Sequence, residues 1–125
     1  MPEKLLYIED NEAQQLAWEM VFRNLGGFEV DLASNGLEGL EKLNTSYSVI
    51  VLDMSLPKLN GLGFLDRLHS EDRYCEFRKI PIVVFTVWGD LQDVEQKCQH
   101  YHVKLISKEE DDEFVVQEIK KFIHN

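Results

Sequence analysis

Short apolar runs alternate along the whole chain with segments in which apolar residues recur every three or four positions. The runs are typical of strands and occupy residues 5–8, 28–32, 49–52, 82–85 and 103–107. The periodic segments are typical of helices and occupy positions 13–20, 37–43, 62–68, 91–99 and 114–123. Residues 69–79 read as a long polar connector. The pattern therefore predicts five strand–helix units.

The run at residues 49–52 is Val-Ile-Val-Leu, with no polar alternation, which indicates a strand buried on both faces. Strands that alternate with helices form a parallel sheet covered by helices on both faces, with right-handed crossovers. For a chain of 125 residues we expect a doubly wound α/β fold with five parallel strands in the order 2-1-3-4-5 and five helices.

Composition and charge narrow the class of protein. The length fits one domain over residues 1–125, and no composition shift marks a linker, so we expect no output domain. A net charge of -10 argues against nucleic acid or an anionic membrane as partner. The sequence contains no secretory signal pattern and no apolar run of about 18 residues, so we expect a cytoplasmic protein with no membrane insertion. Cys75 and Cys98 are expected to be reduced thiols.

Polar residues that could bind a ligand or react with one follow four of the five predicted strands. Glu9 and Asp10 end the first run, Asp53 ends the third, Thr86 ends the fourth, and Lys108 follows the fifth. In a sheet of this order, ligands bind at the carboxyl ends of the strands, between the first and third strands. Three acids, a hydroxyl and an ammonium should therefore meet at one crevice.

Clustered carboxylates repel one another unless a positive charge lies among them. A hard cation such as Mg²⁺, or Mn²⁺, suits oxygen ligands of this kind. Beside such a cation, Asp53 becomes a plausible nucleophile toward a phosphoryl donor. Thr86 can donate a hydrogen bond to a phosphoryl oxygen, and Lys108 supplies a point charge.

Four segments together resemble the receiver domain of bacterial response regulators, over essentially the whole chain: YIEDN, VLDMSLPKLNG, VVFT and LISK. The resemblance implies a flavodoxin-like fold and makes Asp53 the phosphoacceptor. It implies that Asp10 is the direct metal ligand, that Glu9 acts through water, and that the carbonyl of Ser55 is a further metal ligand. Thr86 matches the switch hydroxyl and Lys108 the lysine that pairs with the phosphoryl group.

The resemblance also implies partners. The phosphodonor would be a histidine kinase or a histidine phosphotransfer protein, and phosphorylation would rearrange the face formed by the fourth helix, fifth strand and fifth helix. That face would bind a downstream protein or a second copy of the chain. The protein would be a signalling switch that takes part in its own phosphorylation and autodephosphorylation, not an enzyme.

Three positions depart from the family pattern. Glu109 follows Lys108 where proline is usual, and a cis bond without proline costs about 3–4 kcal/mol, so we predict a trans Lys108–Glu109 bond. Leu105 replaces the usual aromatic toggle. Val87 and Trp88 follow Thr86 where small residues are usual, and they are predicted to narrow access to the site.

Three alternatives were weighed. A flavin carrier on the same fold would need a phosphate-cradling loop where Glu9 and Asp10 stand. A Mg²⁺-dependent phosphohydrolase with an aspartyl nucleophile would need a further acid and a substrate cap, for which 125 residues leave little room. A pseudo-receiver, acting only as a protein-interaction module without phosphorylation, remains open because of Leu105 and Glu109.

Overall fold

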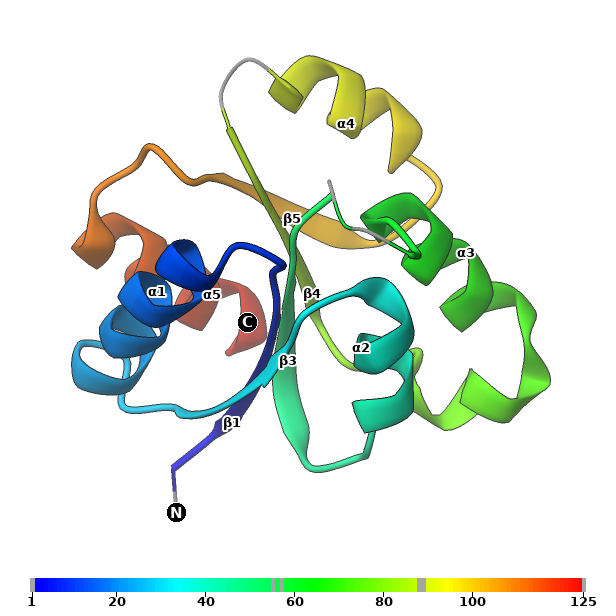
Figure 1. Cartoon of the computed structure of the whole chain (residues 1–125), viewed down its shortest axis with the longest axis horizontal. Coiled ribbons are helices and arrows are strands. Elements are labelled where there is room, and N and C mark those ends of the chain that lie inside the picture. Colours follow the sequence, from blue (N-terminus) through cyan, green and yellow to red (C-terminus); the bar gives the residue numbers. More distant parts are fainter. Residues whose placement is uncertain (1, 55, 57, 88–89, 125) are drawn as a thin grey trace.

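A parallel sheet of five strands, in the order β2-β1-β3-β4-β5, forms the centre of the computed structural model, which describes residues 2–54, 56, 58–87 and 90–124 (Figure 1). This is the order that the sequence predicts. The strands are β1 (Lys4–Ile8), β2 (Glu29–Ala33), β3 (Tyr47–Leu52), β4 (Ile82–Thr86) and β5 (Val103–Ser107).

Helices cover both faces of the sheet (Figure 1). They are α1 (Glu12–Asn24), α2 (Gly36–Lys42), α3 (Gly61–Ser70), α4 (Leu91–Lys97) and α5 (Asp112–Ile123). The apolar cores place α1 and α5 on one face, where Phe22 and Ile119 pack, and α2, α3 and α4 on the other, where Leu40, Phe64 and Val94 pack. No helix among the described residues is both long and apolar enough to span a bilayer.

Alternation along β1 divides its side chains between the two cores. Leu5 and Tyr7 belong to the core under α1 and α5, whereas Leu6 and Ile8 belong to the core on the opposite face. All four are fully buried, because β1 lies inside the sheet between β2 and β3. The strand is thereby fixed in position up to its last residue, after which the acidic pair begins.

The segment between α3 and β4 is more ordered than the sequence predicts. α3 continues to Ser70, and a 3-10 helix, η1 (Asp72–Phe77), fills most of the expected connector. Tyr74 and Phe77 from η1 pack against the core on the α3 side. The prediction of a polar connector over residues 69–79 therefore missed a 3-10 helix and its two aromatic anchors.

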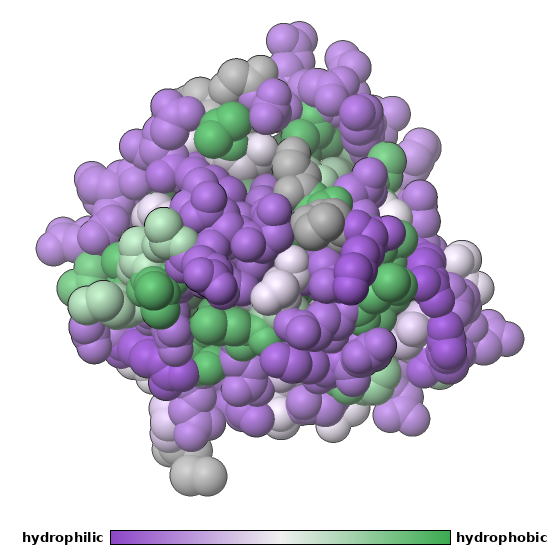
Figure 2. All heavy atoms as spheres, in the orientation of Figure 1, coloured by the Kyte–Doolittle hydropathy of each residue, from purple (hydrophilic) through white to green (hydrophobic). Residues whose placement is uncertain are grey.

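The apolar stripe by which the sequence predicts α1 lies on the solvent side of that helix. Leu16 and Met20 are each 62% exposed, and Ala13 and Ala17 are also exposed. Trp18 and Phe22 pack toward the core instead. Figure 2 shows the apolar residues gathered over α1, at the left of the view. The helix was predicted correctly, but its buried face is the aromatic one.

Candidate functional site

The acidic residues meet because β1 and β3 are neighbours in register. Ile8 pairs with Leu52, so Glu9 and Asp53 leave the sheet side by side. The backbone N–H of Asp53 donates to the carbonyl of Ile8 at 3.1 Å, which continues the ladder past the end of the strands. The crevice therefore opens between the first and third strands, where the doubly wound order predicts it.

Glu9, Asp10 and Asp53 each place a carboxylate oxygen within 4.8 Å of the others. Glu9 and Asp53 are buried, whereas Asp10 is exposed and makes no hydrogen bond or ion pair with the described part of the chain. Three carboxylates this close repel one another unless cations offset them. The oxygen donors and the excess negative charge fit a hard divalent cation.

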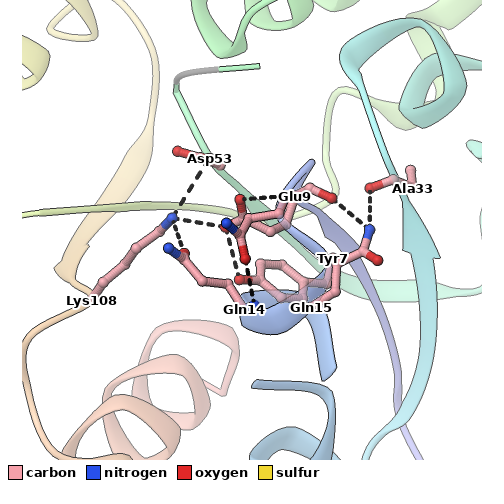
Figure 3. Close-up of polar contacts among 8 residues, drawn as sticks. Tyr7, Glu9, Gln14, Gln15, Ala33, Asp53 and Lys108 are labelled. Carbon is pink, nitrogen blue, oxygen red and sulfur yellow. Dashed lines mark hydrogen bonds and ion pairs between the residues drawn. The ribbon is translucent and has the colours of Figure 1, made fainter. Parts of the chain in front are cut away.

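Lys108 brings a positive charge to the cluster, and its ammonium contacts both Glu9 and Asp53 (Figure 3). Its Nζ lies 2.7 Å from Glu9 Oε1 and 3.5 Å from Asp53 Oδ2. The side chains are 11% exposed for Lys108, 2% for Glu9 and 10% for Asp53, so water screens these pairs poorly. A lysine 99 residues along the chain from Glu9 is thus brought to the acids, as the sequence predicts.

Glu9 accepts several further hydrogen bonds. Its Oε1 also accepts from the hydroxyl of Tyr7 at 3.1 Å, and its Oε2 accepts from the backbone N–H of Asn11 at 3.3 Å. Burial alone would raise the pKa of Glu9, but the hydrogen bond and charge of Lys108 outweigh it and hold that pKa below its usual value. Glu9 is therefore ionised at neutral pH, and Asp10, which is exposed, is the acid of the cluster most accessible to a cation from solvent.

The Tyr7 hydroxyl has a consequence for alkaline stability. Burial and the nearby charge of Glu9 raise the pKa of Tyr7 above its ordinary value of 10.0. Above about pH 10 the unfolded chain loses this proton while the folded chain keeps it, so the free energy of unfolding falls as the pH rises, by up to about 1.4 kcal/mol per pH unit. Tyr7→Phe should remove this contribution. Urea unfolding of both proteins at about pH 9, 10 and 11 should show a shallower decline for the variant; parallel declines would contradict the prediction.

The loop after β5 adopts a form that suits a non-proline residue after the lysine. No cis peptide bond occurs among the described residues, so the predicted trans Lys108–Glu109 bond is confirmed. The N–H of Lys108 donates to the carbonyl of Thr86 at 2.7 Å, and the N–H of Glu109 donates to Ser107 Oγ at 3.0 Å. Ser107, paired with Thr86 across the sheet, thus anchors the loop that carries the lysine.

Thr86 is buried and lies between two cavities. One, of about 270 Å³, is also lined by the three acids and Lys108, together with Val87. The other, of about 490 Å³, extends from Thr86 to α4 and is lined by Leu56 and Val94, among others. Leu105 is half-buried and packs against the core on the α4 side. The expected Ser55 carbonyl ligand and the expected narrowing by Trp88 lie outside the described residues.

Gly61, the last residue of the segment VLDMSLPKLNG, is required by a close backbone approach. A Cβ at this position would lie 2.7 Å from the carbonyl oxygen of Asp53 and 2.8 Å from Cα of Met54. Asn60 caps α3 by accepting from the N–H of Gly63 at 2.8 Å, so the helix begins directly against the acceptor strand. The start of α3 therefore fixes the position of Asp53.

A larger cavity, of about 630 Å³, lies elsewhere, at the amino ends of β3 and β4. Its lining includes the charged residues Glu3, Glu76 and Lys79, but among the described residues three carboxylates converge only at Glu9, Asp10 and Asp53. The smaller cavity, at the carboxyl ends of the strands, contains the acids and Lys108. The types of residue that line a cavity therefore identify this site better than the volume of the cavity does.

Sequence reasoning missed three contributors to the site. Tyr7 was read only as an apolar strand residue, although its hydroxyl bonds to Glu9. Gln14 accepts from Lys108 Nζ at 2.7 Å, and the Gln15 amide bridges the carbonyls of Glu9 and Ala33. The sequence could have predicted the two glutamines, because Asn11 directly follows the acidic pair and caps α1. The first turn of α1, which carries Gln14 and Gln15, must then lie over the crevice.

Comparison with known proteins agrees with this architecture. The family model of the response regulator receiver domain matches residues 5–120. The chain is 32% identical over 115 residues to the polar-differentiation response regulator DivK of Brucella anthropi, with 86% of this chain and 88% of that protein covered. It is 36% identical over 88 residues to the transcriptional regulatory protein CpxR homolog of Haemophilus influenzae, a match that covers 70% of this chain but only 35% of that protein.

A solved structure extends the similarity to the fold. The receiver domain of the sensor histidine kinase PA1611 from Pseudomonas aeruginosa PAO1, which has a magnesium ion coordinated in its active-site cleft, superposes with a TM-score of 0.82. The sequences are 22% identical, and the match covers 100% of both chains. The order of the strands, the acidic crevice and the family match over residues 5–120 lead to one conclusion: the chain belongs to the response regulator receiver domain family.

Proposed function

We propose that this chain is a phosphoacceptor of a two-component or phosphorelay system, in which Asp53 takes a phosphoryl group from a phosphohistidine donor in a Mg²⁺-dependent reaction. The observation that carries the proposal is the buried Asp53 carboxylate, which lies beside the acids Glu9 and Asp10 and 3.5 Å from the ammonium of Lys108. A cytoplasmic location is part of the same proposal.

The acids would hold the cation through Asp10 and Asp53, with Glu9 nearby; Mn²⁺ fits the same oxygen donors. When bound, the cation would offset the negative charge that otherwise repels an anionic donor. Asp10 suits direct contact because it is exposed and makes no other polar contact within the described residues. Glu9 already accepts from Lys108, Tyr7 and Asn11, so its own contact with the cation would run through water.

The chain's own residues account for the transfer step. An Asp53 carboxylate oxygen attacks the phosphorus, and the P–N bond of the donor breaks as the imidazole nitrogen leaves with the bonding electron pair. Lys108 stabilises the charge on a phosphoryl oxygen. The protein itself becomes the product, which makes it a switch with a covalent state and not a catalyst that turns over a separate substrate.

Thr86 connects this step to a possible output surface. It lines both the acidic cavity and the cavity beside α4, so a hydroxyl drawn toward a phosphoryl group on Asp53 changes the wall of the second cavity. Leu105 contributes to the core on the same side. The face made by α4, β5 and α5 would then bind a downstream protein or a second copy of the chain.

Phosphate uptake tests the proposal. The chain is incubated with a small phosphodonor and Mg²⁺, and intact mass is followed over time; a gain of one phosphoryl group is expected, and a chelator should suppress it. Asp53→Asn is the control and should gain none. A wild-type chain that never gains mass under these conditions would favour the pseudo-receiver, which shares the fold but acts without phosphorylation.

The exposed apolar stripe of α1 supports a protein donor. Leu16 and Met20 lie on the helix whose first turn supplies Gln14 to the acidic cavity, so a protein docked on the stripe would lie next to that cavity. Exposed apolar side chains gathered on one helix face are a common mark of a protein contact. A small phosphodonor needs no such contact.

A double substitution of Leu16→Gln and Met20→Gln should therefore separate the two kinds of donor. Transfer from a phosphorylated histidine phosphotransfer domain is expected to slow by about tenfold or more, because the apolar area buried on docking is lost. The rate with a small phosphodonor should stay at the wild-type value. Leu25→Gln, at the exposed residue that follows α1, is the control; equal slowing with both donors would contradict a docking role.

A further inference from the structure

The side-chain amide oxygen of Gln14 contacts Lys108, and no sequence motif predicts this contact. Gln14 Oε1 lies 2.7 Å from Lys108 Nζ, the same distance that separates Nζ from Glu9 Oε1. Figure 3 shows Gln14 reaching the ammonium from α1 and Glu9 reaching it from the end of β1, with Asp53 also beside it. Lys108 is therefore held from two directions.

The effect of this contact follows from the number of N–H groups on the Lys108 ammonium. Lysine Nζ carries three N–H groups and no acceptor. Glu9 and Gln14 take two of them, which leaves the third for Asp53, whose Oδ2 lies 3.5 Å from Nζ. A lysine side chain has a flexible four-carbon stem, so without fixed partners its ammonium would sample many positions.

Gln14 is itself fixed by the site. The backbone N–H of Gln14 donates to Asn11 Oδ1 at 2.9 Å, and the N–H of Asn11 donates to Glu9 Oε2 at 3.3 Å. Glu9, Asn11, Gln14 and Lys108 thus form a closed ring of hydrogen bonds. The same residue that caps α1 places the amide oxygen that holds the lysine.

We propose that Gln14 is a positioning residue for phosphoryl transfer, which holds the Lys108 ammonium so that its third N–H is directed at the phosphoryl group on Asp53. This inference rests on the proposed function. A neutral amide suits the task because it fixes the ammonium without adding a fourth negative charge beside the acids. A carboxylate at position 14 would hold the lysine but compete with the phosphoryl group for it.

Two substitutions of Gln14 distinguish the loss of the hydrogen bond to Lys108 from the addition of a negative charge beside it. Gln14→Met has a similar length and good helix propensity but removes the acceptor oxygen; Gln14→Glu keeps an acceptor and adds charge. The exchange of the Lys108 ammonium protons with water, measured by NMR, should be slow in the wild type and in Gln14→Glu and at least about tenfold faster in Gln14→Met, since one hydrogen bond to a charged group is lost. If Gln14 only stabilised the fold, its substitution would not change the exchange of the Lys108 protons in this way.

Phosphate uptake from a small phosphodonor at saturating Mg²⁺ should slow by about tenfold in Gln14→Met, in line with the loss of one hydrogen bond to a charged group. It should also slow in Gln14→Glu, where the charge competes. Mg²⁺ affinity by calorimetry should stay unchanged in Gln14→Met, because an amide oxygen that faces Lys108 is not needed to hold the cation. Gln117→Met, the same substitution at an exposed position of α5, should behave as the wild type.

The outcomes distinguish the two proposals. If the wild type accepts phosphate and Gln14→Met matches it in both uptake rate and Lys108 proton exchange, the role of Gln14 is overturned while the proposed function stands. If the wild type accepts none, the proposed function fails and the role in transfer fails with it. Faster exchange together with slower uptake in Gln14→Met supports the inference.

Discussion

Lys108→Met is expected to lower the free energy of unfolding at neutral pH by about 3–5 kcal/mol, the range for removing one partner of a buried ion pair. The Glu9 carboxylate is 2% exposed and would lose the ammonium that lies 2.7 Å from it. Asp53, at 3.5 Å, would lose the same charge. Phosphate uptake should also slow, because a phosphoryl oxygen would lack its cationic partner. Urea unfolding and intact-mass time courses measure the two effects.

The loss of unfolding free energy in Lys108→Met should become smaller as the pH falls. The pKa of Glu9 is depressed in the folded protein, so the pair stabilises the fold above the ordinary pKa of a glutamate, and this contribution is lost as the pH falls through the depressed value. The difference between the wild type and Lys108→Met should therefore shrink in acid. Lys97→Met is the matched control, because Lys97 pairs with Asp93 at 3.0 Å on the exposed surface of α4, where such pairs contribute little. A similar loss in both variants would contradict the importance of burial at Lys108.

Gly61→Ala is expected to cost about 1–3 kcal/mol of folding free energy, the usual range for overpacking, and to slow phosphate uptake as well. The added Cβ would meet backbone on two residues, at 2.7 Å from the Asp53 carbonyl oxygen and 2.8 Å from Met54 Cα. Neither atom can rotate away, so either α3 or the acceptor strand must shift. Urea unfolding and uptake from a small phosphodonor measure the two effects.

Gly63→Ala gives the comparison within the same helix. Its nearest obstacle is Leu59 Cδ1 at 2.6 Å, the far end of a flexible side chain, and alanine favours a helix over glycine. Gly63→Ala should therefore leave uptake unchanged and alter stability little. If Gly61→Ala behaved in the same way, the close approach of α3 to Asp53 would not matter for the site.

The sequence predicts the sheet order and the meeting of the acids because both follow from local patterns. The buried run before Asp53 and the acidic pair after β1 fix which strands carry the site, and the doubly wound order brings them together. The trans bond after Lys108 was also predictable, since Glu109 lacks the ring that lowers the cost of a cis bond.

Other features depend on tertiary contacts that periodicity does not reveal. The exposed stripe of Leu16 and Met20 has the same spacing as a core stripe, and only the packing of Trp18 and Phe22 shows which face of α1 is buried. Likewise, Tyr7 reads as a strand residue, and its bond to Glu9 depends on where its hydroxyl ends in the folded core.

The most direct measurement is the identity of the residue that carries the phosphoryl group. After incubation with a small phosphodonor and Mg²⁺, borohydride reduction converts an aspartyl phosphate to homoserine, which peptide mass spectrometry locates. We expect homoserine at position 53 in the wild type and none in Asp53→Asn. Modification at another residue, or undiminished phosphate uptake by Asp53→Asn, would contradict the assignment of Asp53 as the phosphoacceptor.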